Sequence, residues 1–123
     1  MPKKIIVDTS SILYSVSKGR DLFATIRESM PDYRAVISRG VVRELQKMGS
    51  TRRKESRDAR MALEMTKDPG ISIMADLGYV DSWILKEATS TKGIVCTNDS
   101  ELKKKLHLRG ITVLSVGRDG RLR

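Results

Sequence analysis

The chain has little of several residue types, and each shortage removes a class of function. Of its 123 residues, one is a cysteine and one a histidine, Cys96 and His107. A disulfide framework within the chain is therefore excluded, and so is a zinc site built from several Cys and His ligands. A Ser-His-Asp arrangement would have to use His107. Any metal ion bound here must be held by oxygen atoms.

Aromatic residues and long apolar stretches are also scarce. Aromatic residues make up 4% of the chain, so a stacking platform is not the expected way of binding nucleic-acid bases. No segment approaches the roughly 20 apolar residues of a membrane span, and the opening run Ile5-Ile6-Val7 is too short for a signal peptide. We therefore expect a cytoplasmic protein that does not associate with membranes.

Positive charge is abundant. The chain has 24 Lys and Arg against 15 Asp and Glu, a formal net charge of +9, and a pI of about 10.0. Phosphate chains bind such surfaces because Lys and Arg release the counterions of the polyanion. The surplus favours a nucleic-acid partner, and a basic surface that serves only solubility is the alternative.

Short apolar runs alternate with amphipathic segments of helical spacing. The runs expected to be strands cover residues 5–7, 35–37, 71–73, 94–97 and 111–116. The expected helices cover residues 11–17, 20–30, 39–48, 52–67, 79–91 and 100–107. This alternation predicts an α/β fold with a mostly parallel sheet in one domain, residues 1–117. The basic, glycine-containing tail, residues 118–123, is expected to be loose.

Two acidic residues fall where expected strands give way to helices. Asp8 directly follows the run 5–7, and Asp99 follows the run 94–97. Active sites of parallel sheets lie at the carboxyl ends of strands, where two carboxylates repel unless a divalent cation compensates. If the two strands are neighbours, the pair predicts a metal site. Each residue alone is also a common helix N-cap, so a capping role is the alternative.

Two further acids, Glu44 and Asp81, lie near the starts of expected helices. The alternative for each is a solvated acid that the helix dipole stabilises in the first turn. The local pattern does not separate Asp81 from Asp76, or Asp99 from Glu101, as the relevant acid.

Basic residues follow these acids along the chain. The candidates for binding an RNA backbone are Arg43, Lys47, Lys103, Lys104 and Lys105. The three lysines lie on the helix that Asp99 opens, so a phosphate that reaches a metal at Asp99 would find them nearby. Ordinary solvated helix faces are the alternative for both groups.

Four segments in order resemble the motifs of the PIN-domain nuclease family. They are IIVDTSSIL (residues 5–13), VVREL (41–45), YVDSWILKEA (79–88) and VCTNDSELK (95–103), and GITV (110–113) matches the usual final strand. The resemblance spans residues 3–116. Ser10 stands where many members have Asn, and either side chain can hydrogen-bond the first aspartate.

The resemblance implies a three-layer α/β/α sandwich and an Mg²⁺- or Mn²⁺-dependent endoribonuclease. It selects Asp8, Glu44, Asp81 and Asp99 as the catalytic and metal-binding acids. It assigns supporting roles to Ser10, Thr97, Asn98 and, secondarily, Glu101. Asp8, Asp81 and Asp99 would bind the metal that activates water for in-line attack, and Glu44 would hold a second metal or orient the water.

Two other readings compete with this one. A haloacid-dehalogenase-type phosphatase would need a second acid two residues after Asp8, and Ser10 argues against it. A non-catalytic RNA-binding module, for example in ribosome biogenesis, is the second alternative, and the presence of all four acids argues against it. The resemblance leaves open a toxin–antitoxin role or rRNA processing, a single-stranded or structured RNA, a homodimer, and an antitoxin or ribosome-assembly partner.

Overall fold

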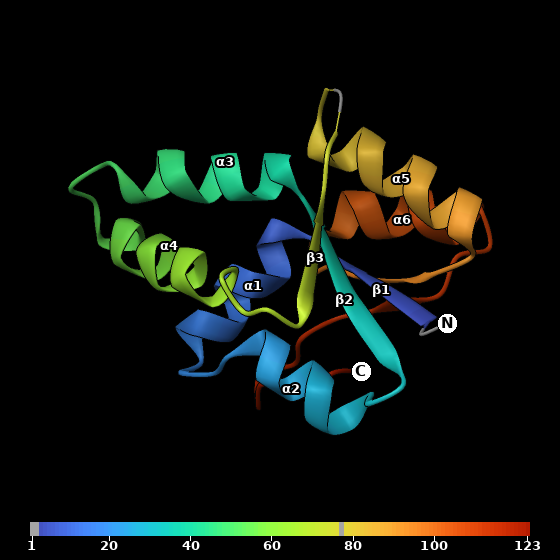
Figure 1. The fold of residues 1–123 in the computed structure, drawn as a ribbon, viewed down its shortest axis with the longest axis horizontal. Helices are drawn as coiled ribbons and strands as arrows, with labels where there is room; N and C mark the ends of the chain where they lie inside the picture. The colour runs from blue at the N-terminus through green and yellow to red at the C-terminus, as the bar shows by residue number, and fades with distance from the viewer. Residues whose placement is uncertain (1–2, 77) are drawn as a thin grey trace.

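The structure is a computed structural model that describes residues 3–76 and 78–123. Five parallel strands form one sheet in the order β3-β2-β1-β4-β5 (Figure 1). The strands are β1 (Lys3–Val7), β2 (Tyr33–Ser38), β3 (Ile71–Met74), β4 (Ile94–Cys96) and β5 (Val113–Leu114). The helices are α1 (Thr9–Ser17), α2 (Leu22–Ser29), α3 (Arg39–Gly49), α4 (Lys54–Met65), α5 (Val80–Thr91) and α6 (Ser100–Leu108).

The central strands form because their side chains are apolar on both faces. Ile5, Ile6 and Val7 of β1 are fully buried, and so are Ile37 of β2 and Val95 of β4. Strands covered by helices on both faces read as continuous β-branched runs rather than as alternating patterns. The expected α/β class is therefore confirmed.

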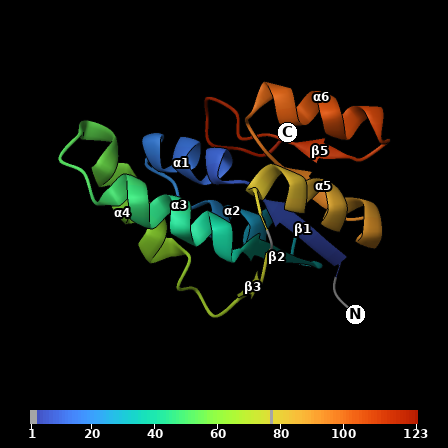
Figure 2. The ribbon, with the colours of Figure 1, turned by 90° about the horizontal axis from the view of Figure 1, so that it is seen from above.

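Helices cover both faces of this sheet. Figure 1 shows α5 and α6 above the central strands and α2 below them, and Figure 2 shows α1, α3 and α4 together at the left. α3 and α4 pack side by side, α4 also contacts α1, and α5 contacts β1 and β4. The arrangement is the three-layer α/β/α sandwich that the resemblance implied. Within the described residues, no helix has both the length and the apolar character needed to span a membrane.

The strand order reverses beside β1. The chain runs outward from β1 through β2 to β3, and then returns to the opposite side of β1 to form β4 and β5. Ligands of doubly wound sheets bind outside the carboxyl ends of the strands where the order reverses. Here that point lies between β1 and β4, which directly precede Asp8 and residues 97–99.

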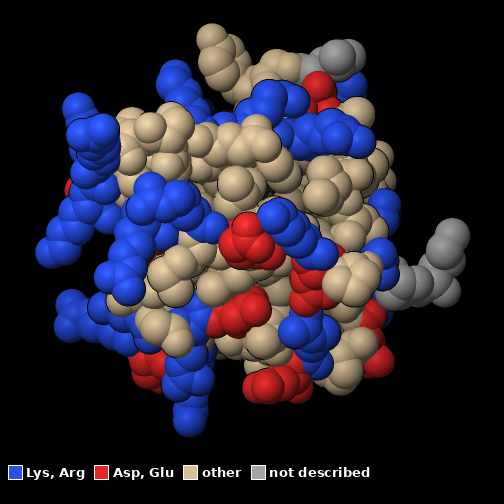
Figure 3. All heavy atoms as spheres, turned by 60° about the vertical axis from the view of Figure 1, so that its left-hand side comes forward, with Lys and Arg blue, Asp and Glu red and all other residues tan. Residues whose placement is uncertain are grey.

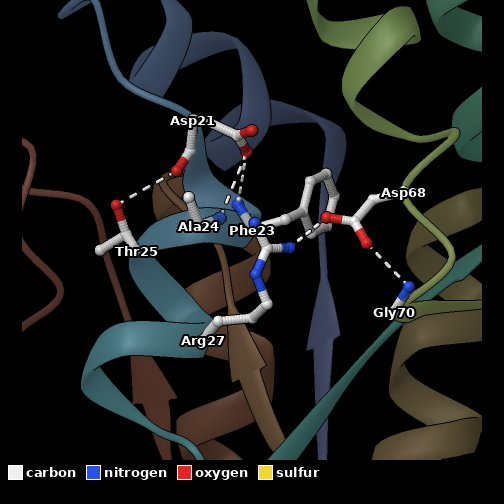
Figure 4. A network of polar contacts seen from close by, with 7 residues as sticks. All are labelled: Asp21, Phe23, Ala24, Thr25, Arg27, Asp68 and Gly70. Carbon is white, nitrogen blue, oxygen red and sulfur yellow. Dashed lines mark hydrogen bonds and ion pairs between the residues drawn. The ribbon is translucent and has the colours of Figure 1, made fainter.

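A polar network ties α2 to the turn before β3 (Figure 4). Asp21 Oδ1 caps α2 by accepting hydrogen bonds from the backbone N–H groups of Phe23 (3.0 Å) and Ala24 (3.3 Å). One turn later, Arg27 pairs with Asp68, whose other oxygen accepts from Gly70 N at 2.7 Å. The Arg27–Asp68 pair therefore links α2 to the turn that leads into β3, an edge strand of the sheet, although the two segments are far apart in the sequence.

The C-terminal region differs from the prediction. The last strand covers Val113–Leu114 rather than residues 111–116. Residues 115–123 are not loose but turn back as a hairpin, in which Ser115 and Arg123 exchange two backbone hydrogen bonds of 3.2 and 2.9 Å. Val116 bridges Leu122 in the same hairpin, and Gly120 has a φ of +79° at its turn. Gly117 lies within this hairpin, where its N–H donates to the Arg121 carbonyl at 2.8 Å.

Candidate active site

Asp8 lies at the end of β1 with its carboxylate buried and held from two sides. The residue is 5% exposed, and Ser10 Oγ and Thr97 Oγ1 both donate to its Oδ2, at 2.6 and 2.8 Å. Asp8 occupies the N-cap position of α1 but its side chain makes no capping hydrogen bond. The purely capping alternative is thus wrong for Asp8. The hydrogen bonds of the described residues leave its Oδ1 unused.

Asp99 caps α6 and also lies close enough to Asp81 to raise the pKa of that acid. Its Oδ1 accepts from the backbone N–H groups of Glu101 (2.9 Å) and Leu102 (3.2 Å) at the start of α6. The Asp99 N–H donates to Thr97 Oγ1 at 3.1 Å, so one threonine links both aspartates. Capping occupies one carboxylate oxygen and leaves Oδ2 without a hydrogen bond from the described residues.

Asn98 fixes the loop between these two aspartates. Its amide oxygen accepts from Ser11 Oγ (2.7 Å) and Val116 N (3.0 Å), and its amide nitrogen donates to the Val116 carbonyl at 2.9 Å. Its backbone N–H donates to Ser10 Oγ at 3.1 Å. The loop after β4 is therefore tied to α1 and to the end of β5. Ser10, Thr97 and Asn98 therefore form one hydrogen-bonded group with Asp8.

Glu44 on α3 and Asp81 on α5 complete the acidic group. Partial burial raises the pKa of Glu44, and the charges of Asp8 and Asp81 raise it further. Burial also raises the pKa of Asp81, followed by the charges of Asp8 and Asp99. Asp8 is thus close enough to raise the pKa of both Glu44 and Asp81, and Asp99 is close enough to raise that of Asp81. The fold therefore places Glu44 and Asp81 near the two strand-end aspartates, although they come from different helices.

A threonine that the sequence analysis did not single out lies among these acids. Thr9 is 6% exposed, and its hydroxyl is close enough to lower the pKa of Glu44. The same hydroxyl makes no hydrogen bond of good geometry within the described residues. The only sequence signal for it was its place directly after Asp8.

Asp76 was the alternative to Asp81 in the sequence analysis, and its side chain pairs with an arginine. Its side chain is fully buried, and its Oδ1 accepts from Arg43 Nη2 at 2.9 Å. Its Oδ2 lies against Gly40, where a Cβ would come within 2.3 Å of it. Asp76 still contributes to the raised pKa of Glu44. Asp76 is therefore a fifth acid beside the site, and its carboxylate is paired with an arginine.

The basic candidates have different surroundings. Lys105 is near enough to lower the pKa of Asp81, which places it beside the acids. Lys104 pairs with Glu101 at 3.7 Å, and both side chains are about three-quarters exposed. The structure therefore places the Glu101 carboxylate toward solvent, and only its backbone N–H supports Asp99.

Figure 3 shows one face on which Lys and Arg side chains surround a smaller group of acidic side chains. Arg43 and Lys47 line a hollow that also includes Glu44 and Tyr79. Lys103, one turn after Asp99, is half-buried. The five candidate cations thus lie on two helices. One is α3, which also carries Glu44, and the other is α6, which begins directly after Asp99.

The chemistry of the site is that of oxygen ligands. Burial raises the pKa of the Cys96 thiol to about 11, so this neighbour of the site stays protonated near neutral pH. His107 lies on the last turn of α6, about 12 Å along the helix from Asp99. Carboxylate oxygens favour Mg²⁺ or Mn²⁺ over zinc. Within the described residues, no three acidic, Cys or His side chains are grouped so that they could hold a common metal ion.

Comparison with known proteins decides the family. A family model described as a PIN like domain matches residues 5–119, nearly the whole chain. The chain belongs to this PIN-domain family. It is also 32% identical over 118 residues to Ribonuclease VapC9 of Archaeoglobus fulgidus, covering 95% of this chain and 85% of that protein.

Solved structures agree with this assignment. The PIN domain endonuclease Utp24 superposes with a TM-score of 0.82 and 28% identity, covering 99% of this chain and 90% of the Utp24 chain. A domain of a functionally unknown protein from Methanocaldococcus jannaschii has a TM-score of 0.66 and 21% identity, covering 94% of this chain and 91% of that one. The second likeness shows the fold alone. The first likeness is to a PIN domain that is named as an endonuclease.

Proposed function

We propose that this PIN-domain protein is a divalent-metal-dependent endoribonuclease that hydrolyses RNA phosphodiester bonds. The observation that carries the proposal is that Asp8 and Asp99 follow the neighbouring strands β1 and β4, with Glu44 close to Asp8 and Asp81 close to both. Like charges at such close range are costly unless a cation is bound there. Relatives named as a ribonuclease and as an endonuclease support the same reading.

Asp8 and Asp99 are the acids best prepared to hold an ion. Each has one carboxylate oxygen anchored by two hydrogen bonds, which leaves the other oxygen for a ligand. Partners that orient a ligating carboxylate increase metal affinity because the side chain loses less freedom on binding. Asp81 is proposed as the third ligand. Glu44 is proposed to hold a second ion or to orient the attacking water.

A bound Mg²⁺ or Mn²⁺ would polarise the scissile phosphate and lower the pKa of a water molecule for in-line attack. The residues of the chain would place the substrate around that chemistry. Lys105, beside Asp81, and Lys103, on the first turn after Asp99, are proposed to bind phosphates that flank the scissile bond. Arg43 and Lys47 are proposed to extend this contact along α3.

The experiment is cleavage of a labelled RNA of mixed sequence by the purified protein with Mn²⁺ or Mg²⁺. We expect cleavage that EDTA abolishes and products without 2′,3′-cyclic phosphate ends, because water rather than the 2′-hydroxyl of the RNA is the nucleophile. Contaminating ribonucleases that use the RNA's own 2′-hydroxyl leave cyclic phosphates and do not need the metal. RNA binding without cleavage in either metal would contradict the proposal and favour the non-catalytic RNA-binding module.

The biological RNA and the partners are a separate part of the proposal. We propose either a toxin, held inactive by an antitoxin, or a processing nuclease associated with ribosome assembly. Sequencing the RNA ends that the protein generates separates these roles, since a processing nuclease cuts one precursor site. Size-exclusion chromatography with light scattering tests the expected homodimer.

A further inference from the structure

Tyr79 is an aromatic residue whose exposure has no structural explanation. It is 84% exposed, whereas Phe23 and Trp83 belong to the buried core. The rings of Tyr14 and Tyr33 are partly buried and are covered by lysine ammonium groups at 5.3 and 5.8 Å. Among the aromatic residues that the structure describes, Tyr79 alone offers a wide-open ring.

The backbone of Tyr79 has a structural role, but its side chain has none. The residue stands at the N-cap position of α5, and its carbonyl accepts the first helical hydrogen bond, from Trp83 N at 3.1 Å. Its side chain makes no capping hydrogen bond. Any residue that adopts an extended backbone could occupy this position. An aromatic side chain here points to a ligand, because exposed aromatic rings contribute little to stability and much to recognition.

Tyr79 lines two hollows that share Glu44 and Val80. One, of about 310 Å³, is lined by Glu44, Tyr79, Val80, Asp81 and Ser82. The other, of about 220 Å³, is lined by Gly40, Arg43, Glu44, Lys47, Gly78, Tyr79 and Val80. The side chain therefore borders both the hollow that contains Asp81 and the hollow that contains two cations. The Arg43–Asp76 pair, at 2.9 Å, holds one of these cations in place.

We propose that Tyr79 stacks on the base of the nucleotide next to the scissile phosphate. The proposal rests on the proposed function, because it needs an RNA phosphate at the acids. One phosphate of that nucleotide lies at the acids, and the neighbouring phosphate lies at Arg43 and Lys47. Stacking on a single ring accepts any base, since every base has a π-face. It requires that base to leave a duplex stack, so the stacked nucleotide is unpaired.

The first test compares Tyr79→Ala and Tyr79→Phe on an RNA with one mapped cleavage site. We expect KM to rise about tenfold in Tyr79→Ala, as the loss of one base stack predicts, with little change in kcat. Tyr79→Phe keeps the ring and should resemble the wild type. Leu108→Ala removes another exposed apolar side chain, on the last turn of α6, and should have no effect. An unchanged KM in Tyr79→Ala overturns the proposal.

The second test places an abasic nucleotide at each position around the cleavage site in turn. At the stacked position, the wild type should fall to the level of Tyr79→Ala, and Tyr79→Ala should lose nothing more. If the two proteins differ equally on every abasic RNA, Tyr79 does not stack on a base. A Tyr79→Ala protein that cleaves normally but no longer binds a protein partner would show that the ring is a docking residue instead.

A binding measurement separates this proposal from the proposed function. An RNA that carries a fluorescent purine analogue at the stacked position should be quenched by the wild type and not by Tyr79→Ala, in EDTA. If the wild type cuts no RNA but the quenching depends on Tyr79, the nuclease proposal fails, and Tyr79 stacks on RNA in a non-catalytic binding module. If the wild type cuts RNA and Tyr79→Ala quenches equally, only the stacking proposal fails.

Discussion

Thr97 donates a hydrogen bond of 2.8 Å to Asp8 across the boundary between β4 and β1, 89 residues apart in sequence. The same hydroxyl accepts from the Asp99 N–H at 3.1 Å. We expect Thr97→Val to lower metal affinity about 10- to 100-fold, because Asp8 loses an orienting partner. The unmet Asp99 N–H should cost about 1–3 kcal/mol of stability. Isothermal titration with Mn²⁺ and chemical denaturation measure the two effects.

Thr97→Ser is the matched control for that prediction. It retains the hydroxyl and loses only a methyl group, so metal affinity should stay close to that of the wild type. A Thr97→Val protein that binds Mn²⁺ as tightly as Thr97→Ser would show that the hydroxyl does not orient the site.

Asp81 and its acidic neighbours should destabilise the protein when no metal is bound. Burial and the charges of Asp8 and Asp99 raise the pKa of Asp81 in the folded state. A raised acid pKa costs stability above that pKa, and the cost disappears as pH falls through it. We therefore expect Asp81→Asn to raise the Tm by a few degrees near neutral pH in EDTA, and to show a smaller Mn²⁺-induced rise than the wild type.

Glu28→Gln supplies the comparison for Asp81→Asn. Glu28 is an exposed acid on α2, outside the acidic group, and its loss changes the net charge by the same amount. If both variants respond alike to EDTA and to Mn²⁺, the effect comes from net charge and not from crowding of the four acids.

Cys96 should report on unfolding rather than on chemistry. Burial raises the pKa of its thiol to about 11, and only the thiolate reacts quickly with alkylating reagents. We expect the native protein to resist iodoacetamide near neutral pH and to react at one site in guanidinium, since the chain has a single cysteine. Fast alkylation of the native protein would contradict the burial of β4.

Asp68 should make stability depend on pH in acid. The Gly70 N–H, and then the Arg27 guanidinium, lower the pKa of Asp68 in the folded state. A lowered acid pKa contributes stability above the unfolded value of about 3.9 and loses it as pH falls through the folded value. We expect Asp68→Asn to be less stable than the wild type near neutral pH, and the difference to vanish in acid. Asp32→Asn, an exposed acid outside this network, should show no such convergence.

Much of the sheet was predictable because its strands are buried on both faces. Ile5-Ile6-Val7 and Val95-Cys96 are apolar runs that end at polar residues. The end of β1 was predicted correctly at Val7, and β4 ends at Cys96, one residue before the predicted end at residue 97. The sequence argument assumed that β1 and β4 are neighbouring strands. The structure shows that they are, with Val7 opposite Cys96.

The C-terminal hairpin was missed although the sequence contains its signal. The apolar run 111–116 favours a long strand, but Ile111 N bonds to the Leu106 carbonyl at the end of α6, and Ser115 turns toward Arg123. Asp119-Gly120, between Val116 and Leu122, is a typical hairpin turn. The segment was predicted to be loose because it is short and basic, and the Asp119-Gly120 turn signal was not used.

The site was predictable in part. Strand-end position alone pointed to Asp8 and Asp99, whereas Glu44 and Asp81 depended on the family resemblance. Local pattern could not show that Arg43 holds Asp76, because the two residues are 33 apart and no periodicity links them. The exposure of Tyr79 was equally hidden, since a tyrosine near a helix start can as easily belong to the core.

Asp99→Asn measures the central claim most directly, and Asp21→Asn is its natural control. Both aspartates cap a helix through Oδ1 and two backbone N–H groups, but only Asp99 lies at the proposed metal site. Asparagine caps a helix about as well as aspartate, so both variants should fold with nearly unchanged Tm. We predict that Asp21→Asn cleaves RNA in Mn²⁺ like the wild type and that Asp99→Asn loses at least about a hundredfold in kcat. Equal metal-dependent cleavage by the two variants would contradict the account, because it would leave Asp99 with a capping role alone.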